Sequence, residues 1–358
     1  MRIATIVGAR PQFIKMAPVS RELKRREIEE VIIHTGQHYD YDMNRIFFEQ
    51  LNIPEPDYYL GVGSGSHGYQ TGEMIKRIEE VLMKEKPDLV LVYGDTNSTL
   101  AGALAAVKLH IKIAHVEAGL RSFDKRMPEE VNRVLTDHVS DYLFAPTETA
   151  VKNLHREGIN TGVYLTGDVM YDALIYNIKI ARDKSKILRE LGLKPKNYLL
   201  ATVHRAENTD NRSRLENIIK AFVESGEPIV FPAHPRTRKY LEAYGLMEIV
   251  SKADNIILIN PVGYLDMLVL EENAKKILTD SGGVQKEAYF LKVPCITLRE
   301  KTEWVETVED GWNTLVGANK EKILKAIWEF EPMGKTYTYR FGDGRASERI
   351  VQILVGTL

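Results

Sequence analysis

Short apolar runs alternate with helical patterns along the whole chain. The first run, RIATIVG at 2–8, precedes a stretch at 13–26 in which apolar residues return every three or four positions. Such runs predict buried strands, and such spacing predicts amphipathic helices. Further strands are expected at 30–36, 87–93, 112–116, 142–146 and 163–168. Strands that alternate with helices predict a parallel, doubly wound sheet, as in Rossmann-like folds.

A second half repeats this pattern after a break in composition at 192–197. Its strands are expected at 198–203, 228–232, 255–260, 276–279 and 294–298. Because the 358 residues exceed what one hydrophobic core usually serves, we expect two domains. The predicted divisions are a first Rossmann-like domain at 1–169, a connecting helix at 170–192, a second Rossmann-like domain at 193–345, and a helix at 346–358 that crosses back to the first domain. The predicted fold class is α/β, with two doubly wound domains facing a cleft.

Composition narrows the classes of function. Acidic and basic residues nearly cancel, leaving a formal charge of −2, so a surface for nucleic acid is not expected. Cys295 is the only cysteine, which excludes an internal disulfide and a Cys-rich zinc site and fits a reducing compartment. His34 and His38 have no third ligand near them in the sequence, so no metal site is expected. Without a signal peptide or an apolar run as long as a membrane span, we expect a cytoplasmic protein with no membrane segment.

The stretch KILTDSGGVQKEAYFL at 276–291 contains the clearest candidate site. Its strand and its helix are joined by a turn of four residues, Asp280, Ser281, Gly282 and Gly283. Glycine lets a bulky anion approach the backbone, and the first N–H groups of a helix have no partner inside it. The helix dipole favours negative charge there by roughly 0.3 to 2 kcal/mol, so we expect a diphosphate at this turn and ribose hydroxyls at Glu287.

Charged residues also follow the strands of the first half. Arg10 and Lys15 come after the first strand in a turn that lacks the G-x-G-x-x-G pattern, so no nicotinamide cofactor is expected. Asp95 and Glu117 follow two later strands, where a carboxylate is costly to desolvate unless it has a partner or a function. Cations suit a departing phosphate, and carboxylates in different environments suit removal and return of a proton. A transferase or lyase-like step on a nucleotide sugar is therefore favoured.

Eight ordered segments extend over nearly the whole chain. They are GARPQFIKMAP at 8–18, HTGQHYD at 34–40, GDTNSTLAGALAA at 94–106, HVEAGLRS at 115–122, MPEEVNR at 127–133, TVHRAEN at 202–208, PAHPRT at 232–237 and TDSGGVQKEA at 279–288. Together they resemble the non-hydrolysing UDP-N-acetylglucosamine 2-epimerases. The resemblance implies a fold like that of the B-type glycosyltransferases, a UDP-sugar substrate, a homodimer, and no metal or nicotinamide cofactor.

The resemblance also implies a mechanism. UDP is eliminated to give 2-acetamidoglucal and then adds back with C2 inverted, producing a precursor of cell-surface glycans. The implied catalytic residues are Asp95, Glu117, Glu129 and His204. An acidic residue in the first turn of a helix usually only stabilises the helix dipole, so Glu129 taken alone would not be assigned a catalytic role. The resemblance nevertheless implies such a role for it. The implied substrate-binding residues are Arg10, Lys15, Asp95, Glu117, His204, Val262, Met267, Ser281, Gly282, Gly283, Glu287 and Trp304.

Two features depart from the family pattern. A second, allosteric UDP-N-acetylglucosamine site would involve Gln37, His38, Tyr69 and His234, but bacterial members commonly have arginine where this chain has Tyr69. Trp304 stands where many members have an arginine that contacts UDP.

Four alternatives stay open. One is a UDP-2,3-diacetamido-glucuronate 2-epimerase, in which Arg121, Arg126 or His67 would meet the sugar carboxylate. The others are a glycosyltransferase on the same scaffold, a nucleotide-sugar sensor without catalysis, and a hydrolysing epimerase.

Overall fold

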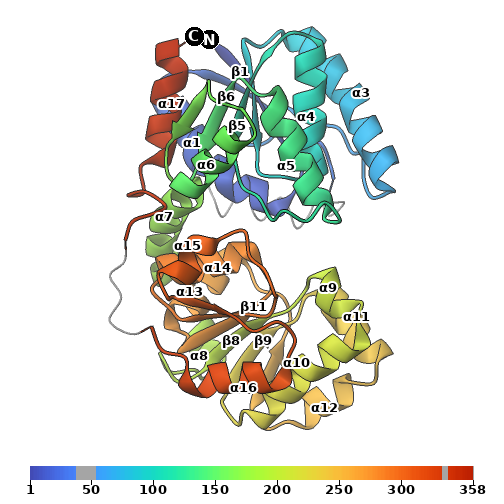
Figure 1. Ribbon diagram of the computed structural model, residues 1–358, viewed down its shortest axis with the longest axis vertical. Coiled ribbons are helices and arrows are strands. Elements are labelled where there is room, and N and C mark those ends of the chain that lie inside the picture. Colours follow the sequence, from blue (N-terminus) through green and yellow to red (C-terminus); the bar gives the residue numbers. More distant parts are fainter. Residues whose placement is uncertain (38–53, 333–337, 358) are drawn as a thin grey trace. The chain divides into compact units, whose positions relative to one another are not determined.

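The structure, a computed structural model, describes residues 1–37, 54–332 and 338–357 (Figure 1). The chain forms two compact units. The first combines Met1–Ile175 with Tyr339–Leu358, and the second is Tyr176–Thr338. Each unit contains one sheet whose strands are all parallel.

The sheet of the first unit has the strand order β3-β2-β1-β4-β5-β6-β7. Its strands are β1 (Arg2–Val7), β2 (Glu29–His34), β3 (Tyr58–Tyr59), β4 (Leu89–Tyr93), β5 (Lys112–Val116), β6 (Tyr142–Ala145) and β7 (Val163–Leu165). The accompanying helices are α1 (Arg10–Arg25), α3 (His67–Glu85), α4 (Asn97–Lys108), α5 (Pro128–Val139), α6 (Glu148–Arg156), α17 (Ala346–Thr357) and the start of α7 (Val169–Lys184).

The sheet of the second unit has the order β10-β9-β8-β11-β12-β13. Its strands are β8 (Leu199–Thr202), β9 (Ile229–Pro232), β10 (Ile256–Ile259), β11 (Lys276–Thr279), β12 (Cys295–Thr297) and β13 (Asn313–Leu315). Its helices are α8 (Ile187–Glu190), α9 (Ala206–Thr209), α10 (Arg212–Glu224), α11 (Pro235–Ala243), α12 (Met247–Lys252), α13 (Tyr264–Asn273), α14 (Gly282–Phe290), α15 (Val305–Glu309) and α16 (Lys320–Glu329).

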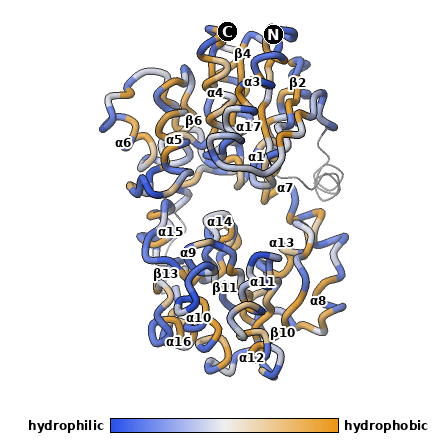
Figure 2. Tube along the Cα trace, turned by 90° about the vertical axis from the view of Figure 1, so that its right-hand side faces the viewer, coloured by the Kyte–Doolittle hydropathy of each residue, from blue (hydrophilic) through white to orange (hydrophobic). Residues whose placement is uncertain are grey.

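Burial explains why the central strands consist mainly of apolar residues. Every residue of β4, β8 and β11 is buried, because helices cover both faces of a parallel sheet. Figure 2 shows hydrophobic residues, in orange, along the strands and polar residues, in blue, in many of the connecting segments. In each sheet the strand order reverses at one point, between β1 and β4 and between β8 and β11. Ligands of open α/β sheets bind at the carboxyl ends of the strands beside such a point.

The predicted α/β class with two doubly wound domains is confirmed. Each strand expected from the sequence forms within two residues of its predicted ends except β7, which ends at Leu165, three residues before the predicted end. The helix predicted at 170–192 is wrong as a single element, because α7 ends at Lys184 and a short α8 follows. Ser185, between them, donates its hydroxyl to Asp266 Oδ1 on α13 at 2.5 Å. Within the described residues, no helix is long and apolar enough to cross a membrane.

The last helix belongs to the first unit. α17 packs against α1, as the fold-class prediction required. Asp172, on α7, accepts the N–H groups of Ala346 and Ser347 at 3.1 and 2.8 Å and the Ser347 hydroxyl at 2.6 Å. This carboxylate therefore caps the start of α17, where backbone N–H groups lack partners within the helix.

Candidate active site

The carboxylate that follows β5 lies in a buried ion pair. Glu117 is 6% exposed, and its φ of 75° is in the left-handed region that non-glycine residues rarely adopt. Its N–H and that of Ala118 both donate to the Phe144 carbonyl of β6 at 3.1 Å. The Lys15 ammonium, from α1, pairs with Glu117 Oε2. A buried carboxylate is thus held in an unfavourable backbone conformation beside a cation that compensates its lost hydration.

Asp95, which follows the neighbouring strand β4, is more accessible. Its side chain is 29% exposed, and Arg133 Nη2, from α5, donates to its Oδ2 at 2.6 Å. Asn132 Nδ2, on the same helix, donates to the Asp95 carbonyl at 3.0 Å. Helix α5 therefore positions both the backbone and the carboxylate of Asp95 and leaves the side chain partly open to solvent.

The two glutamates at the start of α5 differ. Glu130 is buried and accepts the N–H groups of Ser122 and Phe123 at 2.8 and 2.9 Å, together with Arg133 Nη1 at 3.2 Å. Its carboxylate therefore holds the loop before α5. Glu129 is half-buried in the first turn of the same helix, and its acid/base role stays a prediction.

A buried network connects the turns after β4 and β5. The ring of His115 lies with Nε2 2.7 Å from the Gly94 carbonyl oxygen and Nδ1 2.7 Å from Asp137 Oδ1. Asp137 Oδ2 accepts the Gly119 N–H at 3.1 Å and Arg121 Nη1 at 2.7 Å. Because both ring nitrogens face acceptors, both contacts are hydrogen bonds only when both nitrogens carry a proton. The network thereby fixes the two backbone turns that present Asp95 and Glu117.

The three cations considered for a sugar carboxylate lie in different environments. The Arg121 side chain is 1% exposed and pairs with Glu157 at 2.6 Å as well as with Asp137, so it has almost no surface for a ligand. Arg126 is 88% exposed and pairs with Asp124 at 2.6 Å. His67 Nδ1 lies 3.2 Å from Asn97 Nδ2 at the start of α3.

In the second unit, a fully buried carboxylate holds the loop that carries His204. Asp280, after β11, accepts the N–H groups of His204 and Arg205 at 3.0 and 3.1 Å. It also accepts Asn208 Nδ2 at 3.0 Å. The half-buried His204 ring has Nδ1 3.7 Å from Asp280 Oδ1, and its centroid lies 5.9 Å from that of His234. Asp280 therefore positions the histidine through its backbone.

At the predicted diphosphate turn the helix starts earlier than expected, because α14 begins at Gly282 and so includes both glycines of the turn. Ser281 is its N-cap, and the Ser281 hydroxyl oxygen accepts the Val284 N–H at 3.5 Å. A Cβ on Gly282 would lie 2.7 Å from Glu303 Oε1 and 3.1 Å from Trp304 Nε1, so only glycine fits there without displacement. Glu287 is buried one turn further along the helix.

The segment around Trp304 packs on this helix. The Lys286 ammonium, on α14, lies 3.9 Å from the centroid of the Trp304 ring, and both side chains are buried. Arg299 and Glu303 form a neighbouring buried ion pair at 3.1 Å. Trp304 therefore contacts the Lys286 cation through the face of its ring.

The other predicted residues lie as follows. Arg10 is the first residue of α1. Val262 and Met267 flank the start of α13 and are half-buried. Gln37 Oε1 accepts the Ser98 N–H at 3.0 Å, and Tyr69 is 55% exposed on α3.

The other two residues of the predicted allosteric site are His234 and His38. His234 is the N-cap of α11, where its Nδ1 accepts the Arg236 N–H at 3.1 Å. His38 lies outside the described residues.

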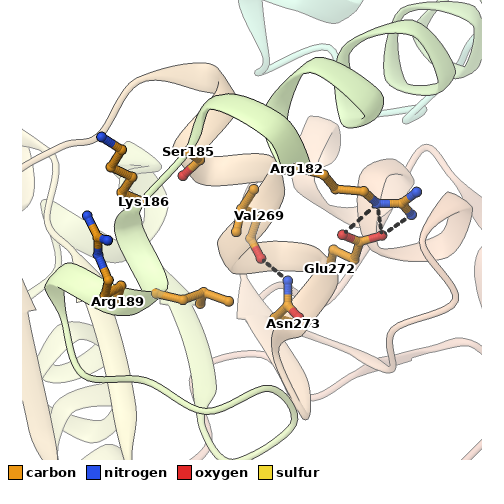
Figure 3. Close-up of a pocket in the computed structure, with 8 residues that line it drawn as sticks. Arg182, Ser185, Lys186, Arg189, Val269, Glu272 and Asn273 are labelled. Carbon is orange, nitrogen blue, oxygen red and sulfur yellow. Dashed lines mark hydrogen bonds and ion pairs between the residues drawn. The ribbon is translucent and has the colours of Figure 1, made fainter.

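A pocket lies in the second unit (Figure 3). It has a volume of about 440 Å³ and is lined by α7, α8 and α13, with Arg182 paired to Glu272 at its edge. None of its lining residues is a predicted site residue. Among the described residues, no group of three or more His, Cys, Asp or Glu side chains could hold a metal ion.

Comparison with known proteins identifies the family. The sequence profile of the family described as UDP-N-acetylglucosamine 2-epimerase matches residues 21–355. The chain belongs to the UDP-N-acetylglucosamine 2-epimerase family. It is therefore classed among the isomerases, and the predicted family is confirmed.

Similarity to individual members extends over whole chains. A UDP-N-acetylglucosamine 2-epimerase homolog of Methanococcus maripaludis is 69% identical over 99% of both chains. A UDP-2,3-diacetamido-2,3-dideoxy-D-glucuronate 2-epimerase of Pseudomonas aeruginosa is 50% identical over 99% of both chains. The crystal structure of Methanocaldococcus jannaschii UDP-GlcNAc 2-epimerase, in complex with UDP-GlcNAc and UDP, has a TM-score of 0.93 and 52% identity, and covers 99% of this chain and 100% of its own.

Sequence reasoning missed the residues that hold the predicted ones. It assigned no role to Arg133, which pairs with Asp95, or to Lys286, which contacts Trp304. It placed Asp280 in the diphosphate turn, whereas this carboxylate accepts hydrogen bonds from the His204 loop. The sequence did indicate that these segments could meet, because β8 and β11 each end in polar residues and neighbouring parallel strands end at the same edge of a sheet.

Proposed function

We propose that this epimerase-family chain interconverts UDP-N-acetylglucosamine and UDP-N-acetylmannosamine. The observation that carries the proposal is the pair of carboxylates at neighbouring strand ends, Asp95 and Glu117, each beside a different cation. One is partly exposed and the other buried, which suits removal of a proton by one group and its return by another. The relative from M. jannaschii, whose structure contains UDP-GlcNAc and UDP, supports the same substrate here.

The proposed reaction proceeds by elimination. The C2 hydrogen of the sugar is not next to a carbonyl, so its removal alone is unfavourable. A carboxylate accepts the C2 proton while the C1–O bond to UDP breaks, and the C2–H electron pair forms the double bond of 2-acetamidoglucal. UDP then bonds to C1 again through its phosphate oxygen, and a proton is delivered to the opposite face of C2. Asp95, Glu117 and Glu129 are the proposed acid/base residues, and His204 is the proposed catalytic histidine.

Charge compensation supports this sequence of steps. Lys15 pairs with Glu117. When Glu117 accepts a proton, its negative charge no longer balances the charge of Lys15. At the same step the departing diphosphate gains negative charge, so Lys15 and Arg10 are proposed to stabilise the leaving group. In the second unit, we assign the nucleotide to the start of α14 and the residues around it. These are Val262, Met267, Ser281, Gly282, Gly283, Glu287 and Trp304.

A second candidate substrate is the UDP-diacetamido-glucuronate. The P. aeruginosa relative that is named for this sugar is 50% identical, close to the 52% of the M. jannaschii protein. The added carboxylate would need a cation that ligands can reach. Arg126 and His67 remain candidates for that contact, whereas Arg121 is enclosed by Asp137 and Glu157.

Three further properties are proposed from the family resemblance alone. They are a homodimer, a cytoplasmic location, and a second UDP-N-acetylglucosamine site that involves Gln37, His38, Tyr69 and His234. Sedimentation of the purified chain would test the first, with a single species at the monomer mass contradicting it.

Proton NMR tests the main proposal. The purified protein is incubated with UDP-N-acetylglucosamine in deuterated water, without added metal or nicotinamide. A growing UDP-N-acetylmannosamine signal, with deuterium incorporated at C2, is the expected result. If neither product nor exchange is observed with this sugar but both are observed with the diacetamido uronate, the second candidate replaces the first. Free N-acetylmannosamine would instead indicate a hydrolysing epimerase.

A further inference from the structure

The pocket lined by α7, α8 and α13 carries an excess of positive charge (Figure 3). Its charged lining residues are three cations and one carboxylate, which leaves a net charge of +2; they are Arg182, Lys186, Arg189 and Glu272. Arg182 pairs with Glu272, so these two charges largely cancel. The excess therefore lies on Lys186 and Arg189, whose side chains are exposed.

These two cations have no carboxylate partner in the part of the chain that the structure describes. They are three residues apart at the start of α8, a spacing that places side chains on one side of a helical turn. In Figure 3 both lie on the side of the pocket opposite the Arg182–Glu272 pair. Like charges at this spacing repel each other, so an anion bound between Lys186 and Arg189 would stabilise both.

The C-terminal end of α13 borders the pocket through Glu272 and Asn273. Such a helix end carries partial negative charge and by itself would oppose an anion. Lys196 compensates this charge. Its N–H donates to the Asn273 carbonyl at 2.7 Å, and its ammonium donates to the carbonyls of Glu272 and Ala274 at 2.7 and 3.0 Å. The end of α13 is therefore satisfied by a cation that does not line the pocket, and the charges that do line it remain available to a ligand.

The surrounding segment and the size of the pocket indicate the kind of ligand. Residues 179–196 contain seven Lys or Arg and two Asp or Glu, whereas the whole chain has a formal charge of −2, so this segment attracts anions from solution. The volume of about 440 Å³ lies within the roughly 300–1,000 Å³ of small-molecule pockets. Leu188 and Val269 add an apolar part to the lining. These features match a ligand with one anionic group and a compact carbon body.

We propose that this pocket binds a small phosphorylated molecule, with Lys186 and Arg189 on its phosphate and with Leu188 and Val269 on its carbon body. The planar guanidinium and the compact ammonium both suit phosphate oxygens. The inference goes beyond the proposed epimerase reaction, because none of the lining residues belongs to the site proposed for that reaction.

Calorimetric titration with phenyl phosphate, which joins a phosphate to an apolar ring, tests the inference. The wild type should bind this probe. Lys186→Gln combined with Arg189→Gln should bind it about 10- to 100-fold more weakly, because two charge-assisted contacts are lost. Lys179→Gln combined with Lys184→Gln is the matched control. It removes the same charge from exposed positions of α7 that do not line the pocket, and its affinity should stay within about twofold of the wild type.

Two further probes separate the parts of the proposed ligand. Phenol, which lacks the phosphate, should not bind measurably, and inorganic phosphate, which lacks the ring, should bind several-fold more weakly than phenyl phosphate. Phenol that binds as tightly as phenyl phosphate would overturn the role of the cations. Inorganic phosphate that binds as tightly would overturn the role of Leu188 and Val269.

The remaining outcomes also decide. A wild type that does not bind phenyl phosphate would overturn the inference, as would equal losses in the two double variants, which would indicate a long-range field rather than a site. Unchanged binding in Lys186→Gln with Arg189→Gln would place the probe elsewhere on the chain and overturn the inference as well. If that variant does not fold, Arg189→Gln alone decides, with an expected loss of about three- to tenfold. None of these results bears on the proposed epimerase activity, which the wild-type NMR experiment tests separately.

Discussion

Carboxylates follow the central strands of both units, but their partners differ. In the first unit, Asp95 and Glu117 face the side-chain cations Arg133 and Lys15. In the second, Asp280 is fully buried and accepts two backbone N–H groups and an amide. A carboxylate has about four acceptor positions, and those of Asp280 are largely used by the fold. The same residue type after the same kind of strand is therefore suited to chemistry in one unit and to architecture in the other.

The largest effect is expected when the proposed acid/base chemistry of the first unit is removed. Asp95→Asn should lower kcat by about 10²- to 10⁴-fold, because an amide cannot exchange the proton. The fold should survive, since Arg133 keeps Glu130 as an ion-pair partner at 3.2 Å. The rate is measured by NMR and the melting temperature by calorimetry. Glu148→Gln, at an exposed carboxylate of the same unit, is the control, and a fully active Asp95→Asn would remove Asp95 from the acid/base set.

The corresponding change in the second unit should mainly reduce stability. Asp280→Ala leaves buried donors on the His204 loop without an acceptor, at a cost of about 3 kcal/mol in the free energy of unfolding. The melting temperature should fall by roughly 6 to 12 °C. Asp254→Ala, at an exposed position of the same unit, should stay within about 0.5 kcal/mol of the wild type. Equal stability of the two variants would contradict the architectural role of Asp280.

Acidification should reduce the stability of the first unit, in part because the Asp137 carboxylate becomes protonated. Burial alone would raise the pKa of this carboxyl, but the hydrogen bond from His115 and the charges of His115 and Arg121 lower it below its ordinary value. A carboxyl with a lowered folded-state pKa contributes stability above its unfolded pKa of about 3.9 and loses it as the pH falls through the folded value. The free energy of unfolding, measured from about pH 5 downwards, should therefore decline less steeply in Asp137→Asn than in the wild type. Parallel curves would exclude this contribution.

The smallest effect concerns the turn before α14. In Gly282→Ala the new methyl group must displace Glu303 or Trp304, and we expect a three- to tenfold loss of UDP affinity, of the order of 1 kcal/mol. Gly68→Ala on α3 is the matched control, because a Cβ there meets no atom within 4 Å. The control should keep its activity and gain up to about 1 kcal/mol of stability. Unchanged UDP affinity in Gly282→Ala would show that the turn tolerates the displacement.

The sequence predicted the strands well and their partners poorly, for a physical reason. A short run of mainly apolar residues is a local property of the sequence, so β5 forms at the residues expected from the sequence alone. The end of α7 depends instead on Ser185, whose partner Asp266 is 81 residues away. Likewise the strand-end position of Asp95 is local, but its partner Arg133 lies 38 residues further along the chain, and Lys15 lies 102 residues from Glu117. Local patterns in a single sequence do not reveal which residues that are distant along the chain form such pairs.

The cap that Asp172 places on α17 has a consequence for synthesis of the protein. The first unit is built from two separate parts of the chain, and the whole second unit is inserted between them. On the ribosome, residues 1–175 emerge well before α17, so the face of α1 that this helix covers waits until the intervening unit has been made. The second unit, which is continuous in sequence, has all its residues synthesised before α17. The unit whose first residues are translated first therefore also needs the residues that are translated last.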